Sequence, residues 1–169
     1  MIKNQTLIAT PKVSVLMTCY NAASTIEESV RSVLAQTFTD FELVLVDNCS
    51  TDESISIVKR LADPRIRIVA LEKNHGRTPA LNIALNNAHG QYIAILDADD
   101  TSTADRFALQ VDCLDQKSEL VLVASWYRNV DSSGKLINEV KTPTEHLDVV
   151  RRLASNCPFM NSAVMFRAE

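Results

Sequence analysis

Short apolar runs alternate with amphipathic stretches along most of this chain. The runs at residues 12–18, 42–46, 65–71, 92–96 and 120–125 are rich in Val, Ile and Leu, which is typical of β-strands. Between them, apolar residues recur at a spacing of three and four, which predicts helices. Most of the predicted strands are almost wholly apolar, as expected when helices cover both faces of a sheet.

Polar residues and prolines predict where the helices begin and end. Asp63-Pro64 and Gly90 predict two helix ends, and a further helix is predicted over residues 103–115. Three helix starts are predicted from side chains that can cap a first turn: Ser24 and Thr25 with Glu27 and Glu28, Ser50 with Glu53, and Thr78 followed by Pro79.

Three successive strand–helix units precede residue 92, and this order predicts an α/β fold. We expect a doubly wound, mostly parallel sheet with helices on both faces. Later, Ser132-Ser133-Gly134 predicts a hairpin turn, residues 144–154 a last helix, and residues 163–166 one more strand.

No repeat or linker interrupts this pattern. Residues 11–169 are therefore predicted to form one domain, preceded by an extension over residues 1–10.

Composition narrows the class of protein. The net charge of −4 over 169 residues argues against a nucleic-acid-binding surface. No apolar run is long enough to span a bilayer, and residues 1–10 lack the apolar segment of a secretory signal. The cysteines form no Cys-x-x-Cys pair, so we expect free thiols in a reducing, cytoplasmic compartment: Cys19, Cys49, Cys113 and Cys157.

An acidic turn directly follows the predicted strand at residues 92–96. Asp97, Asp99 and Asp100 stand where open α/β sheets bind their ligands, and ionised Asp is rarely buried without a partner. Carboxylate oxygens are preferred ligands of Mg²⁺ and Mn²⁺, which in turn bind phosphate. A solvated turn with Asp99 or Asp100 capping a helix would give the same pattern.

Two more predicted strands end in polar residues, Thr18-Cys19-Tyr20-Asn21 and Asp47-Asn48-Cys49-Ser50, at the same sheet edge. We predict a nucleoside-diphosphate site in which Tyr20 contacts the base, Asp47 accepts a hydrogen bond from base or ribose, and Asp99 holds the cation. The alternative is that Asp47 only forms a turn and Tyr20 is a half-buried surface ring. Three glycines are too few for a glycine-rich phosphate loop, so metal and side chains are expected to hold the phosphates.

Five segments, in this order, resemble the family 2 glycosyltransferases of the GT-A fold. They are residues 13–21, 32–38, 42–52, 74–82 and Asp97-Ala98-Asp99, the last similar to the family's Asp-x-Asp metal motif. The resemblance implies transfer of a sugar, with inversion, from a UDP- or GDP-sugar to a glycan or lipid-linked acceptor.

By position, the resemblance also implies site residues. Asp99 would ligate Mg²⁺ or Mn²⁺, and Arg77 would reach the phosphates or ribose. The implied nucleotide contacts are Thr18, Tyr20, Asn21, Asp47, Arg77, Asp97 and Ala98.

The family's catalytic base is an Asp or Glu downstream of a strand like that at residues 163–166. We expect this base beyond Glu169, with the GT-A domain incomplete at its C-terminal, acceptor-binding part. Apolar surface exposed in such a part would favour a homodimer or aggregation. Relatives that work at the inner face of the cell membrane imply peripheral membrane association of a longer protein.

Two rival functions stay open. Residues 96–101 fit Asp-x-Asp-x-Thr, the motif of haloacid-dehalogenase-like phosphatases, with Asp97 as the nucleophile. Three preceding strand–helix units and the lack of a downstream acidic pair count against it. The other rival is a nucleotide-sugar-binding fragment without catalysis.

Overall fold

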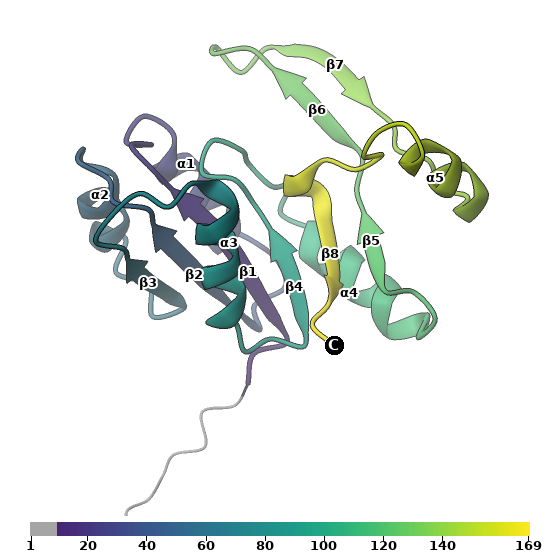
Figure 1. Ribbon diagram of the computed structural model, residues 1–169, viewed down its shortest axis with the longest axis horizontal. Helices are drawn as coiled ribbons and strands as arrows, with labels where there is room; N and C mark the ends of the chain where they lie inside the picture. The colour runs from purple at the N-terminus through teal and green to yellow at the C-terminus, as the bar shows by residue number, and fades with distance from the viewer. Residues whose placement is uncertain (1–9) are drawn as a thin grey trace, which may run out of the picture.

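A six-stranded mixed sheet forms the centre of the protein (Figure 1), whose computed structural model describes residues 10–169. The strand order is β3-β2-β1-β4-β8-β5, with β1 to β4 pairing in parallel and β8 antiparallel to both of its neighbours. The strands are β1 (Val13–Cys19), β2 (Phe41–Asp47), β3 (Ile66–Ala70), β4 (Tyr92–Ile95), β5 (Leu122–Ala124) and β8 (Val164–Arg167). The predicted mostly parallel α/β sheet is confirmed. The extension predicted over residues 1–10 lies outside the described residues except for Thr10.

Helices cover both faces of this sheet, as predicted. On one face α1 (Ile26–Leu34), α2 (Ser54–Arg60) and α4 (Arg106–Gln116) contribute apolar side chains to the larger core cluster. On the other face α3 (Arg77–Asn86) lies across β1 and β2 (Figure 1) and packs two small side chains, Ala80 and Ala84, against them. Small residues let this helix approach the sheet closely.

Helix α1 begins after Thr25 as predicted, but the caps and the other starts differ. Neither α1 nor α2 has a side-chain cap hydrogen bond, so both predicted capping boxes are wrong. Instead, α2 begins at Ser54, whose N–H donates to the Asp52 carboxylate at 3.0 Å. Helix α3 begins at Arg77, so Pro79 occupies its third position, where a helix leaves the N–H unpaired in any case.

Beyond β5, a two-stranded hairpin of β6 (Tyr127–Val130) and β7 (Leu136–Val140) confirms the predicted turn. Helix α5 (His146–Leu153) follows without burying any residue, and η1 (Asn161–Ala163) leads into β8. In Figure 1 the hairpin and α5 stand beyond the β8–β5 side of the sheet. Within residues 10–169, the helices are too short and too polar to cross a membrane.

Gly90 does not end α3, which closes at Asn87; it allows the backbone to pass close to β1. A Cβ at Gly90 would lie 2.4 Å from the Ser14 nitrogen. Next to it, the buried Ser14 hydroxyl accepts from the Gly90 N–H at 2.8 Å and donates to the Glu42 carboxylate at 2.6 Å. Arg67 reaches the other Glu42 oxygen at 3.1 Å. This polar cluster joins three strands at the edge opposite their carboxyl ends.

Burial opposes ionisation of Glu42, but hydrogen bonds from Ser14, the His89 N–H and Arg67 outweigh it and lower the pKa of this carboxyl. A carboxyl whose pKa is lower in the folded chain stabilises the fold above its unfolded titration range. That contribution disappears as the pH falls through the folded value.

Gly90→Ala should destabilise the fold by about 3 kcal/mol, because the added methyl group overlaps the β1 backbone. Gly134→Ala is the matched control, since open space surrounds that position and only its positive φ of 79° opposes a side chain, at about 1 kcal/mol. Urea unfolding measures both. Equal losses would contradict the proposed overlap.

Glu42→Gln should destabilise the fold by about 1–2 kcal/mol at neutral pH, because the amide cannot accept from both Ser14 and Arg67 as the carboxylate does. The difference from wild type should shrink as the pH falls below the ordinary glutamate range. Unfolding midpoints over a pH series test this, with the exposed Glu72→Gln as control. A difference that grows on acidification would refute the assignment.

Candidate functional site

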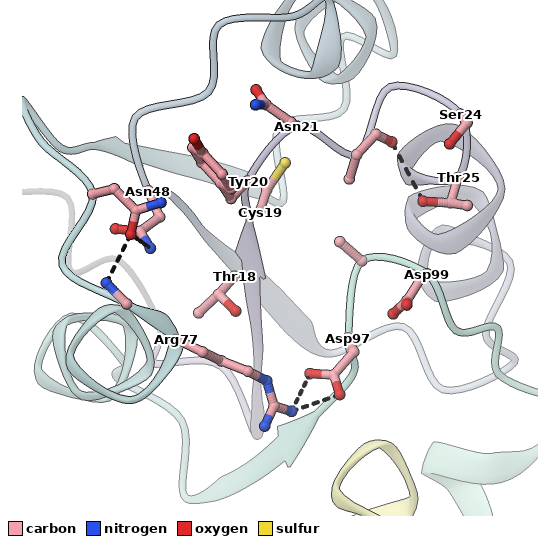
Figure 2. A pocket seen from close by; sticks show the side chains of 14 residues that line it. Thr18, Cys19, Tyr20, Asn21, Ser24, Thr25, Asn48, Arg77, Asp97 and Asp99 are labelled. Carbon is pink, nitrogen blue, oxygen red and sulfur yellow. Dashed lines mark hydrogen bonds and ion pairs between the residues drawn. The ribbon is translucent and has the colours of Figure 1, made fainter.

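A cleft of about 640 Å³ opens at the carboxyl ends of β1 and β4 and beside the loop that follows β2 (Figure 2). Thr18 pairs with Val46 across β1 and β2, and Leu16 pairs with Ile95 across β1 and β4, so the three strands end near one another. The predicted convergence of three loops is therefore present. The lining residues are Thr18, Cys19, Tyr20, Asn21, Ala22, Ser24, Thr25, Asn48, Asn74, Gly76, Arg77, Asp97, Ala98 and Asp99.

The loop after β1 supplies one wall. Tyr20 is 52% exposed, and its ring is available at the cleft surface (Figure 2). Asn21 next to it has a left-handed φ of 51° and is fixed on both sides. Its N–H donates to the Ser50 hydroxyl at 3.1 Å, and its side-chain oxygen accepts from the Thr51 N–H at 2.8 Å. The ring of Tyr20 therefore projects from an anchored backbone.

Asp47 is the predicted site residue that does not line the cleft. It is only 8% exposed, and its carboxylate accepts from the Ser50 N–H at 2.9 Å, which shapes the turn after β2. The neighbouring Asn48 lines the cleft instead. A contact between Asp47 and a nucleoside stays a prediction.

Asn48 and Asn74, which were not predicted as site residues, line the cleft and fix the loop before α3. The Asn48 amide donates to the Asn74 side-chain oxygen at 3.0 Å and accepts from the His75 N–H at 2.9 Å. The Asn74 oxygen also accepts from the Gly76 N–H at 2.8 Å. A signal was present, since Asn74 and Gly76 lie in the segment 74–82 that resembles the family, but that segment does not show that an amide pair fixes the loop.

Two of the three carboxylates of the acidic turn, those of Asp97 and Asp99, line the cleft and are placed differently. Asp97 receives both of its close contacts from one nitrogen of Arg77, at 2.7 and 2.6 Å, and this contact raises the pKa of the guanidinium. Figure 2 shows the pair at one side of the cleft, whereas Asp99 projects elsewhere along its rim and has no contact drawn to it. Asp99 is exposed, so its oxygens are open to the cleft.

The backbone of this turn is held from two sides. The Asp97 N–H donates to the Ser162 hydroxyl at 3.0 Å, and the buried Ser29 of α1 donates to the Ala98 carbonyl at 2.9 Å. Asp100 lies deeper than Asp99. Burial is the main cause that raises the pKa of Asp100, and the charges of Asp99 and Asp97 add to it.

A buried arginine lies behind the turn. Arg106 is 5% exposed and donates to the carbonyls of Ile95 at 3.1 Å and Val164 at 2.9 Å, which ties β4 to β8. Burial lowers the pKa of Arg106 to about 10, partly offset by the charge of Asp100, so it stays a cation at neutral pH. Among the described residues, its Nη1 atom finds no hydrogen-bond acceptor.

The residues present can hold a divalent cation only together with other ligands. In residues 10–169, no three His, Cys, Asp or Glu side chains gather into a complete cation site. Mg²⁺ and Mn²⁺ in phosphate sites are commonly held by one or two carboxylates, with phosphate and water completing the shell. The open Asp99 with Asp97 beside it fits that arrangement.

Comparison with known proteins places this chain in a family. The family described as Glycosyl transferase family 2 matches residues 14–167. The succinoglycan biosynthesis protein ExoO of Rhizobium meliloti (strain 1021) is 37% identical over 160 residues, which cover 94% of this chain and 44% of ExoO. The chain therefore spans less than half of that relative.

Two solved structures are similar. The mannosyltransferase PcManGT from Pyrobaculum calidifontis, in complex with GDP-Man and Mn²⁺, gives a TM-score of 0.70 at 27% identity, over 95% of this chain and 45% of PcManGT. S. aureus TarS 1-349, in complex with UDP-GlcNAc, gives 0.60 at 31% identity, over 62% of this chain and 31% of TarS. Together with the match over residues 14–167, these findings show a chain with the GT-A fold that belongs to glycosyl transferase family 2.

Proposed function

We propose that this chain carries the donor-binding part of a glycosyltransferase that uses a UDP- or GDP-sugar and a divalent cation. The observation that carries the proposal is the convergence of an exposed aromatic ring, an arginine and an open carboxylate in one cleft of a family 2 chain: Tyr20, Arg77 and Asp99. TarS with UDP-GlcNAc and PcManGT with GDP-Man and Mn²⁺ support it by their ligands.

Each residue has a role that its position allows. Tyr20 offers an aromatic face on which a base can stack. Arg77 offers guanidinium N–H groups to phosphate oxygens, and Asp99, with Asp97 beside it, would hold the cation. When bound, the cation would neutralise charge that develops on the diphosphate leaving group.

Transfer would proceed with inversion to a glycan or lipid-linked acceptor, as the resemblance implies. The base that deprotonates the acceptor hydroxyl is predicted beyond Glu169. The acceptor and the activity of the whole protein belong to this proposal.

The alternative of a phosphatase has less support. The match to glycosyl transferase family 2 over residues 14–167 and the three strand–helix units before the acidic turn count against it. A binding module without catalysis would show the same cleft. It would bind nucleotide and cation but release no nucleotide from a sugar donor in the presence of acceptor.

Asp99→Ala should abolish the strengthening of nucleotide binding by Mn²⁺, because the open carboxylate is lost. Calorimetry with UDP, and separately GDP, should show that Mn²⁺ raises the wild-type affinity about tenfold to hundredfold, a range typical of coupled ligands. The exposed Asp112→Ala on α4 is the charge-matched control and should behave as wild type. An unchanged Mn²⁺ effect in Asp99→Ala would remove Asp99 from the site.

Tyr20→Ala should weaken binding of UDP by about 1–3 kcal/mol, the usual contribution of one stacked base. Tyr20→Phe keeps the ring and should retain most of the affinity. Titration by calorimetry, with circular dichroism to verify the fold, measures both. Equal losses in the two variants would assign the effect to the hydroxyl and would contradict stacking.

A further inference from the structure

The contact between Arg77 and Asp97 brings together two groups that the proposed function needs separately. Arg77 is the first residue of α3 and Asp97 lies two residues after the end of β4, so the pair joins these two elements at one side of the cleft (Figure 2). In this contact, each group blocks the other: the guanidinium is suited to bind phosphate, and the carboxylate is suited to bind a cation.

We propose that Arg77 and Asp97 form an exchangeable pair: a bound nucleoside diphosphate takes the guanidinium and thereby frees the Asp97 carboxylate for the divalent cation. Arg77 would thus be a positioning residue that makes Asp97 more available to the cation when nucleotide is present. This inference rests on the proposed function and concerns the order and coupling of ligand binding at that site.

The geometry of the contact favours exchange. Both contacts to Asp97 come from Nη2, at 2.7 and 2.6 Å, instead of from two parallel N–H groups. The side chain of Arg77 is 56% exposed, and that of Asp97 is 25% exposed. An ion pair open to water stabilises the fold little, so an acceptor of greater charge can replace the carboxylate.

The surrounding backbone is fixed, so only side chains need to move. Asn74 holds the Gly76 N–H at 2.8 Å and is itself held by Asn48 at 3.0 Å, which anchors the chain just before Arg77. On the other side, Ser162 holds the Asp97 N–H at 3.0 Å. Rotation of the long Arg77 side chain is therefore enough to change its partner.

A nucleoside diphosphate is a stronger competitor than one carboxylate. Its two phosphate groups carry more charge, and guanidinium binds phosphate with the same N–H geometry that it uses for carboxylate. The cation and Arg77 compete for Asp97, whereas the nucleotide relieves that competition. Nucleotide and cation should therefore strengthen each other's binding, by the same factor in both directions.

The test measures the affinity for the cation alone and for the nucleotide alone, because the proposal predicts that one substitution changes these two affinities in opposite directions. In Arg77→Met, Mn²⁺ alone should bind about two- to fivefold more tightly, since Asp97 is released from a partly exposed pair. UDP or GDP without cation should bind about tenfold more weakly, since a charged hydrogen-bond donor is lost. Electron paramagnetic resonance of free Mn²⁺ gives the first affinity, and calorimetry gives the second.

Asp97→Asn provides the reciprocal test. It removes the charge that holds Arg77, so nucleotide alone should bind about two- to fivefold more tightly, while Mn²⁺ alone should bind more weakly. Arg31→Met on α1 is the matched control for Arg77→Met. It also removes one arginine charge from an exposed ion pair, that with Glu27, but this pair lies away from the cleft. It should leave both affinities unchanged.

Two results would overturn the proposal. One is unchanged or weaker Mn²⁺ binding in Arg77→Met, which would show that Arg77 does not compete with the cation. The other is weaker nucleotide binding in Asp97→Asn, which would show that Asp97 holds Arg77 in its binding position. Failure of the proposed function looks different, since wild type would then bind neither UDP nor GDP while the Mn²⁺ measurement still reports on the pair.

Discussion

The pairing of β1 with a parallel neighbour on each side is the constraint on which the cleft depends. Its register with β2 and β4 brings the loops after Cys19, Asp47 and Ile95 to one edge of the sheet. The Cys19 carbonyl accepts from the Asn48 N–H at 2.8 Å, and the Leu16 carbonyl accepts from the Leu96 N–H at 3.1 Å. A slip of one residue in either pairing would turn the side chains of the shifted strand to the opposite face of the sheet.

The charges around the acidic turn are balanced by two arginines of different kinds. Arg106 is buried and donates to strand carbonyls, so its charge is fixed in place behind Asp100. Arg77 is exposed and contacts a single carboxylate. The first stabilises the framework of the turn, and the second faces the cleft where a ligand can reach it.

Local patterns predicted the strands and the shared edge well, because buried parallel strands require continuous apolar runs. The same patterns failed for the caps of α1 and α2, because the Thr25 hydroxyl donates to the Ala22 carbonyl and the Ser50 hydroxyl accepts from the Asn21 N–H. Capping side chains have several local partners, and the choice depends on neighbouring loops that sequence spacing does not show.

Contacts between distant segments were beyond prediction for the same reason. The antiparallel direction of β8 and the pairing of Asn48 with Asn74 both depend on where the sheet places remote residues. The Arg77–Asp97 contact belongs to this group, although both residues were predicted at the site. Residue types and order indicated the members of the site but not their partners.

The insertion of β8 between β4 and β5 has a consequence for how the chain is made. Tyr92 of β4 meets its partner Arg167 only 75 positions later. During synthesis on the ribosome, β1 to β4 can assemble early, but the outer edge of β4 then waits unpaired for a late segment. Ser162, which anchors Asp97, emerges just before that segment, so the acidic turn gains this anchor only after β4 has long been synthesised.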